Sequence, residues 1–220
     1  MTCEEALSRL RAMSNPANVA GMARFGINPE GTLGIGMPRI RALAREIGKD
    51  HELAERLWRS GIHEARILAS LVDRPAWVDE AQMERWVVGF DSWDVCDQVC
   101  MNLFDRTPIA HAKACEWAER EEEFVRRAGF ALMAALARKG RQTPSEQLES
   151  FFPIIARHAS DGRNFVKKAV NWALRQIGKR DDALRGRAIA VAEQIAEQPS
   201  ASARWIARDA LRELRGNVLQ

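Results

Sequence analysis

The chain repeats a short segment of aromatic and basic residues after 41 positions, and this repeat constrains the fold more than any other feature. Residues 124–128 read Phe-Val-Arg-Arg-Ala, and residues 165–169 read Phe-Val-Lys-Lys-Ala. Each copy is followed by an apolar-periodic run that ends in a basic pair, at 138–139 and at 179–180. A period near 40 residues with small residues inside helical segments indicates stacked helix pairs.

Good helix formers fill almost every segment, and Gly and Pro fall between them. We therefore predict an all-α chain, built as a single curved solenoid of HEAT-like helix pairs that forms one domain over residues 1–220. The inner helix of each pair should line a concave surface. We expect helices over 2–13, 16–25, 38–47, 50–60, 63–72, 76–88, 92–103, 107–119, 121–138, 144–158, 163–178, 181–196 and 201–214.

Length and composition limit the class of protein. A chain of 220 residues can bury a substantial core without disulfides or a structural metal. It contains no apolar run long enough to span a bilayer and no N-terminal signal peptide pattern. Its four cysteines form no CxxC pair, which fits a reducing compartment. We expect a cytoplasmic monomer that does not associate with membranes.

The positive charge is concentrated in the C-terminal half of the chain. Residues 1–110 contain 13 basic and 16 acidic side chains, whereas residues 111–220 contain 20 and 14. Within 138–187 the numbers are 12 and 5. Such a bias is often only a solvated surface. If the repeats stack in register, however, the basic pairs fall in a line, and a line of positive charge suits a polyanion such as DNA.

Trp93 and Asp97 are four residues apart on one predicted helix, so they share a face one turn apart. One interpretation is a core tryptophan beside a local salt bridge, since tryptophans are largely buried on average. The other is an aromatic wall next to a carboxylate that meets a developing positive charge, as glycosidic cleavage requires. The sequence pattern by itself leaves both open.

Trp172 lies within the most basic predicted helix and is either a core residue or a stacking platform beside phosphate contacts. Of the adjacent pair Arg126 and Arg127, at most one should face inward, where a guanidinium could grip a phosphate. Arg41 and Arg45 form a further basic face at i, i+4. The residues that we expect to contact DNA are Arg126, Lys167, Lys168, Arg175, Lys179, Arg180, Arg41 and Arg45.

Several chemistries lack their sequence signals. There is no phosphate-binding loop and no dinucleotide fingerprint, because the Gly-Ile-Gly of 34–36 lacks the third glycine. Cys96, Cys100 and His111 do not make the three or four convergent ligands of a metal site. The histidines show no pairing with a Ser or Cys nucleophile. We therefore expect no metal and no cofactor.

The chain resembles the bacterial DNA alkylation repair proteins of the AlkD type, which are DNA glycosylases built from HEAT-like repeats. The resemblance extends over nearly the whole chain. Its most specific parts are a Trp-Asp-x-x-Asp motif and a Trp-x-Leu-Arg motif. The segments that carry it are residues 25–26, 33–41, 57–58, 63–66, 91–97, 126–128 and 169–175.

The resemblance implies an activity and a site. Family members excise cationic N-alkylated purines, such as 3-methyladenine and 7-methylguanine, from duplex DNA without flipping the damaged base into a pocket. Their active-site Trp and Asp, a later Arg and a second Trp fall on Trp93, Asp97, Arg127 and Trp172. A cationic purine is already a good leaving group, so the enzyme needs only to stabilise the sugar cation and position water.

Two other functions remain open at this point. One is a protein of the same fold that binds branched or damaged DNA without catalysis. The other is a HEAT-type scaffold for protein partners. Asp97 together with both tryptophans favours the glycosylase over the binder, because a binder does not need that carboxylate. The basic bias of 138–187 favours both over the scaffold.

Overall fold

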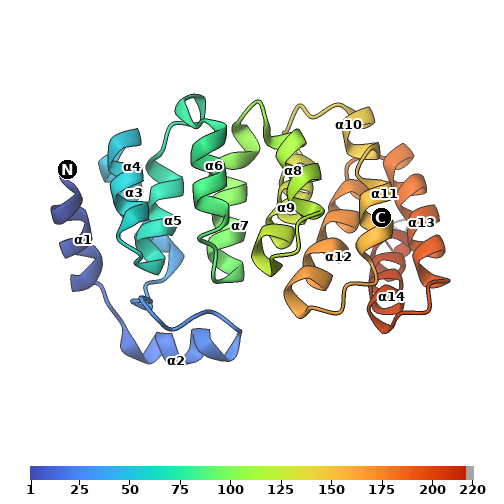
Figure 1. Ribbon diagram of the computed structural model, residues 1–220, viewed down its shortest axis with the longest axis horizontal. Coiled ribbons are helices and arrows are strands. Elements are labelled where there is room, and N and C mark those ends of the chain that lie inside the picture. Colours follow the sequence, from blue (N-terminus) through green and yellow to red (C-terminus); the bar gives the residue numbers. More distant parts are fainter. Residues whose placement is uncertain (217–220) are drawn as a thin grey trace. The chain divides into compact units, whose positions relative to one another are not determined.

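A computed structural model describes residues 1–216. The regular secondary structure of this part of the chain consists of helices, with no strand (Figure 1). The predicted all-α fold class is thus confirmed. The chain packs as two compact units, a first unit of Met1–Thr107 and a second unit that begins at Pro108. The expectation of one domain over 1–220 stays a prediction. None of the described helices is long and apolar enough to cross a membrane.

The first unit contains seven α-helices and two short 3₁₀ helices among its described residues. They are α1 (Cys3–Ala12), α2 (Pro16–Arg24), α3 (Met37–Ile47), α4 (His51–Arg59), α5 (His63–Val72), η1 (Pro75–Trp77), α6 (Glu80–Val87), α7 (Trp93–Asn102) and η2 (Phe104–Arg106).

The second unit likewise contains seven described α-helices. They are α8 (Ala110–Ala118), α9 (Glu123–Leu136), α10 (Ser145–Glu149), α11 (Phe152–His158), α12 (Asn164–Gly178), α13 (Asp182–Ala196) and α14 (Ala201–Gly216). Most bounds fall within three residues of the predicted ones.

Proline chemistry explains where the structure departs from the prediction. The helix predicted over 144–158 is two helices, because Pro153 lies in the first turn of α11, where its missing N–H is tolerated. The helix predicted over 76–88 is likewise divided. Pro75 starts the short η1, and α6 begins only after Asp79, whose carboxylate accepts a hydrogen bond from the Gln82 amide at 2.7 Å.

The core of the first unit contains two tryptophans on neighbouring elements. Trp58 of α4 and Trp86 of α6 stack in parallel, with ring centroids 4.3 Å apart and an angle of 3° between their planes. Phe90 meets the Trp58 ring edge-on at 5.9 Å. Aromatic pairs of this kind bury a large area and add stability beyond that burial. The stacked pair joins α4 to α6.

Hydrogen bonds in the second unit follow the sequence period of about 40 residues. Arg163 donates to the Glu121 carbonyl, and Arg180 donates to the Arg138 carbonyl, each across 42 positions. Ser202 donates to the Asp161 carbonyl across 41 positions. The aromatic rings at 124 and 165 stack at 5.6 Å. Equivalent positions of successive repeats are therefore in contact, so the repeats of this unit stack in register, as predicted.

Close helix packing in the second unit depends on a glycine. A Cβ at Gly129 in α9 would lie 2.4 Å from the backbone nitrogen of Ala118 and 2.9 Å from the carbonyl oxygen of Ala114. Contact with backbone atoms cannot be relieved by rotating a side chain. The absence of a side chain at Gly129 thus sets the distance between α8 and α9.

We predict that Gly129→Ala forces α8 and α9 apart and destabilises the protein by about 1–3 kcal/mol, as overpacking does in a well-packed core. The matched control is Gly186→Ala, since Gly186 lies in α13 with no atom near its absent Cβ. That change should raise stability by about 0.5–1 kcal/mol through helix propensity. Thermal midpoints of the two variants check this, and equal midpoints would contradict it.

Candidate functional site

A buried carboxylate organises the loop between α2 and α3. Glu64, in the first turn of α5, is 0% exposed. One carboxylate oxygen accepts from the backbone nitrogens of Gly34 at 2.7 Å and Ile35 at 3.0 Å, and the other accepts from Leu33 at 2.8 Å. Three charge-assisted hydrogen bonds from backbone N–H groups compensate the cost of burying this charge. The loop is thereby fixed against the start of α5.

The same loop is also tied to the start of α7. The Ser92 hydroxyl accepts from the backbone nitrogen of Asn28 at 2.9 Å, and the Asn28 amide donates to Asp91 at 3.1 Å. Gly34 has a φ of +76°, and a Cβ there would lie 2.2 Å from the Asn15 carbonyl oxygen, so the turn requires glycine. The N-terminal ends of α3, α5 and α7 therefore meet around one loop.

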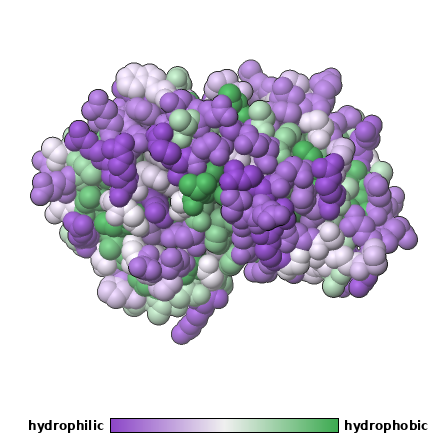
Figure 2. Space-filling view, viewed as in Figure 1, coloured by the Kyte–Doolittle hydropathy of each residue, from purple (hydrophilic) through white to green (hydrophobic). Residues whose placement is uncertain are grey.

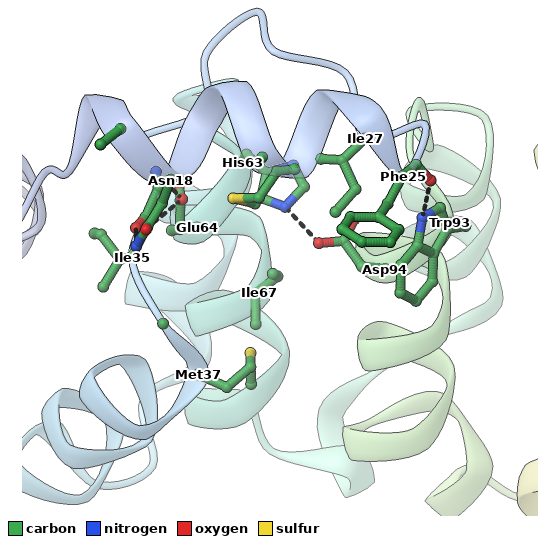
Figure 3. Close-up of a pocket in the computed structure, with 15 residues that line it drawn as sticks. Asn18, Phe25, Ile27, Ile35, Met37, His63, Glu64, Ile67, Trp93 and Asp94 are labelled. Carbon is green, nitrogen blue, oxygen red and sulfur yellow. Dashed lines mark hydrogen bonds and ion pairs between the residues drawn. The ribbon is translucent and has the colours of Figure 1, made fainter.

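Trp93, the first residue of α7, forms one wall of a cavity at these helix ends (Figure 3). Its indole N–H donates to the Phe25 carbonyl oxygen at 3.0 Å. The cavity has a volume of about 580 Å³. Apolar side chains of α2, the loop and α5 make up most of its wall, among them Met22, Ile27 and Ile67. Trp93 is partly exposed, so the structure places it at a cavity wall rather than in the core.

The helix that closes this cavity, α2, lies at the surface of the first unit. No residue of α2 is buried, and apolar surface is visible where α2 lies, at the lower left of Figure 2. Phe25, which directly follows α2, is 74% exposed. Large exposed aromatic side chains beside a cavity are typical of binding surfaces.

A histidine and a carboxylate meet at the floor of the cavity. His63 Nε2 lies 2.9 Å from Asp94 Oδ2, and the His63 side chain is almost fully buried. Burial alone would lower the pKa of His63, but the hydrogen bond and the negative charge of Asp94 outweigh it and raise that pKa. Asp94 lies in the first turn of α7, where a negative charge is favoured by the helix dipole.

Asp97 follows Trp93 by one turn of α7, and its carboxylate is largely withdrawn from solvent, with the residue 8% exposed. The neighbouring thiols are buried as well. Burial raises the pKa of the Cys100 thiol well above its ordinary value, and a hydrogen bond with Cys96 adds to this effect. A thiol of this kind is a poor nucleophile. The ionisable groups of α7 that are suited to chemistry are therefore its two carboxylates, Asp94 and Asp97.

Arg127 and Trp172 belong to the second unit. Arg127 lies in α9 with 5% exposure, and its guanidinium donates to the Phe165 carbonyl at 2.6 Å. Trp172 lies in α12, is partly exposed, and its indole nitrogen is 3.2 Å from the side-chain amide of Gln176. Of the two adjacent arginines, Arg127 is the more deeply buried, while Arg126 pairs with Asp161 at 2.9 Å.

Half of the eight basic residues expected to contact DNA form ion pairs or hydrogen bonds within the protein. Arg175 and Lys179 of α12 both pair with Glu213 of α14, with 2.7 Å between the Lys179 ammonium and the carboxylate. Arg180 donates to the carbonyl oxygens of Arg138 and Arg141. These side chains join neighbouring repeats, a role that the sequence pattern did not reveal because their partners are about 40 positions away.

Two of the expected basic residues on α12 are differently placed. The Lys167 ammonium lies over the Trp205 ring, 4.9 Å from its centroid. Lys168 is exposed and makes no ion pair within residues 1–216. In the first unit, Arg41 and Arg45 of α3 are likewise exposed and unpaired within the described chain.

Sequence reasoning missed three contributors to the site. The pairing of His63 with Asp94, the anchoring by Glu64 and the contact between Trp93 and Phe25 all join segments 30 or more positions apart. The only signal was that these residues fall within the segments that carry the family resemblance. The convergence of Trp93 and Asp97 with Arg127 and Trp172 stays a prediction.

Comparisons with known proteins fit this description. Stacked helix pairs with a period near 40 residues make this a HEAT-like repeat protein. A family described as DNA alkylation repair enzyme matches residues 6–214, and the chain belongs to that family. No curated protein sequence matches the chain.

Solved structures are similar to the chain to different degrees. One, described as a new family of proteins related to the HEAT-like repeat DNA glycosylases with affinity for branched DNA structures, has a TM-score of 0.80 at 19% identity. The match covers 98% of this chain and 97% of that chain. An engineered protein has a TM-score of 0.41 at 12% identity, covering 80% and 90%. A designed armadillo repeat protein has a TM-score of 0.38 at 14% identity, covering 80% and 91%.

We predict that Glu64→Gln lowers the free energy of unfolding by about 2–4 kcal/mol, because an amide has one acceptor oxygen for three buried backbone donors. Hydrogen exchange should show lost protection at the amides of residues 33–35 in particular. Glu52→Gln, an exposed change in the first turn of α4, is the control. Retained protection at 33–35 in Glu64→Gln would show that the loop does not depend on this carboxylate.

A second prediction concerns Asp161. Burial alone would raise its pKa, but hydrogen bonds from Arg163 and Arg126 outweigh it and hold the pKa at about 2, against an ordinary 3.8. Because the folded-state pKa is depressed, this stabilisation is present above about pH 4 and is lost as the pH falls toward 2. Asp161→Asn should lower the thermal midpoint at neutral pH and flatten its fall between pH 4 and 2.

The control is Asp182→Asn, which also removes one negative charge. Asp182 is exposed and pairs with Arg185, not with Arg163 or Arg126. This variant should leave the acid dependence nearly unchanged. An Asp161→Asn protein with the acid dependence of the wild type would contradict the assigned ion pairs.

Proposed function

We propose that the protein is a DNA glycosylase that excises positively charged N-alkylated purines, 3-methyladenine and 7-methylguanine among them, from duplex DNA in base-excision repair. Membership of the DNA alkylation repair family supports the substrate class. The observation that carries the proposal is the arrangement on α7, where a largely buried carboxylate lies one turn from an indole at a cavity wall.

The chemistry follows from the charge of the lesion. As the bond between C1′ and the cationic purine breaks, the purine takes the bonding electrons and leaves neutral, and the sugar becomes positively charged. Asp97 stabilises that charge and orients the water that attacks C1′. The electron-rich face of Trp93 packs against the deoxyribose. A similar contact from Trp172, in the second unit, stays a prediction. The leaving purine needs no proton, so no general acid is required.

In this proposal, Arg127 and the basic residues of α12 bind phosphates of the DNA backbone. Arg127 grips a phosphate once its guanidinium releases the Phe165 carbonyl oxygen. Lys167 and Lys168 supply further phosphate contacts, since neither lysine is neutralised by an ion pair. Arg126, Arg175, Lys179 and Arg180 could reach a phosphate only by exchanging an existing intramolecular partner. We therefore expect the two lysines to contribute more to affinity than these four residues.

The alternative is a protein that binds branched or damaged DNA without cutting a glycosidic bond. It is favoured by the structural similarity to a protein that is described as having affinity for branched DNA structures. Binding of this kind uses the same fold and the same basic residues. It does not use a carboxylate beside the bound sugar, because a negative charge there repels phosphate. The two functions therefore differ in the role of Asp97.

We predict that Asp97→Asn slows release of 7-methylguanine from methylated duplex DNA by about 10- to 1000-fold, the effect of losing one electrostatic contact in the transition state. Affinity for undamaged duplex should hold or rise slightly. Single-turnover excision and fluorescence anisotropy measure the two quantities separately.

Asp94→Asn is the matched control, because it removes the same charge from the same helix at the His63 pair. Excision by that variant should fall less than excision by Asp97→Asn. The thermal midpoint of each variant identifies a folding defect. Full excision by a folded Asp97→Asn protein would remove the carboxylate from the mechanism, and no excision by the wild type would favour the branched-DNA binder.

A further inference from the structure

The first unit has a basic hollow where α3 and α5 end, away from the cavity at their N-terminal ends. Its volume is about 360 Å³, and it is lined by Arg41, Ala44, Arg45, Gly48, Lys49 and Leu71. In Figure 1 the chain segment that follows α5 is at the upper edge of the first unit, whereas α2 is at the lower edge. The hollow is thus separate from the wall formed by Trp93.

The lining of this hollow carries three cationic side chains and no carboxylate. Arg41 and Arg45 are exposed and make no ion pair among residues 1–216. The Lys49 ammonium donates to the carbonyl oxygens of Leu71 at 2.9 Å and Asp73 at 2.7 Å. Burial and the neighbouring Arg106 guanidinium lower the pKa of Lys49, with only partial compensation from Asp73. Positive charges therefore repel one another here.

The acidic residues of this region are engaged elsewhere. The buried Asp73 carboxylate contacts His51 at 2.7 Å and the Gln82 amide at 2.6 Å. Asp50 accepts from the backbone of α4 as its N-cap, and Glu46 pairs with Arg9 at 2.7 Å. The excess of cations is thus available to an external anion.

An exposed tryptophan is linked to the hollow through Arg74, which contacts both its ring and Lys49. Trp77 of η1 is 59% exposed, although a tryptophan is among the costliest side chains to leave in water. The Arg74 guanidinium lies 5.0 Å from the centre of its ring and also donates to the Lys49 carbonyl at 3.0 Å. His51 meets the ring edge-on at 5.8 Å. η1 packs against η2, the helix that carries Arg106.

We propose that this surface binds a single-stranded segment of DNA, with phosphates at Arg41 and Arg45 and an unpaired base stacked on Trp77. Cations beside an exposed aromatic ring are the combination that single-stranded nucleic acid requires. A duplex offers phosphates but covers the faces of its bases, so it does not use the tryptophan. The inference goes beyond excision and rests on the proposed function only in taking DNA as the polymer.

The test compares two labelled DNAs by fluorescence anisotropy, a blunt duplex and the same duplex with a single-stranded thymidine tail. The wild type should bind the tailed DNA more tightly. Trp77→Ala should weaken binding of the tailed DNA by about 5- to 100-fold and leave the blunt duplex nearly unaffected. Trp77→Phe should restore most of the difference, which a folding defect would not.

The double variant Arg41→Ala/Arg45→Ala should also weaken binding of the tailed DNA and reduce the slope of log affinity against log salt by about 1.4. Arg11→Ala/Arg56→Ala is its control, since both residues are exposed arginines of the first unit outside the hollow. The inference fails if the wild type binds both DNAs equally, or if Trp77→Ala keeps the preference for the tail. Displacement of the tail by polyglutamate as readily as by thymidine oligomer would also overturn it.

Excision separates this inference from the proposed function. Trp77→Ala should release 7-methylguanine from blunt methylated duplex at the rate of the wild type. The wild type could release no methylated base while Trp77→Ala abolishes the preference for the tailed DNA. In that case the proposed function fails and the inference stands.

Discussion

The buried carboxylate of Glu64 is the interaction on which the candidate site depends. An isolated buried charge is unfavourable, so this side chain is compatible with the fold only while the loop supplies its three backbone donors. The loop in turn can direct those three donors at the carboxylate only with glycine at position 34. Because Glu64 and the loop depend on each other, the position at which the chain enters α3 is fixed. The hydrogen bond from Trp93 to the Phe25 carbonyl forms beside this loop. The wall of the cavity therefore depends on a carboxylate that is bound to the backbone of the loop.

Much of the fold follows from local sequence signals. Helix formers, proline positions and the 41-residue repeat predict the helices and the stacking of the second unit, because these signals act over a few residues or repeat along the chain. The division at Pro153 was missed, since a proline can begin a helix as readily as end one. The sequence also could not reveal the cavity beside Trp93, because its walls come from segments that are distant along the chain.

The basic residues illustrate a second limit. Counting charges predicts a positively charged surface in the second unit, but not how those charges are used. Arg175 and Lys179 face Glu213 across the packed helices α12 and α14, and Arg126 faces Asp161. A pairing between repeats is invisible in a charge count, because the two partners are 34 to 38 positions apart along the chain. Positive residues in a repeat protein thus serve the stacking of repeats as well as external partners.

The distinction between a repair enzyme and a DNA-binding relative lies in one kind of interaction. Phosphate contacts favour the bound complex equally before and during a reaction, so they raise affinity without accelerating bond cleavage. A carboxylate beside the sugar has the opposite character, since it repels phosphate in the bound state and attracts the sugar only as positive charge develops. On α7 a largely buried aspartate lies one turn from an indole at a cavity wall. If the sugar of the DNA lies at this indole, as proposed, that placement opposes binding in a protein that only binds DNA, whereas in an enzyme it lowers the barrier.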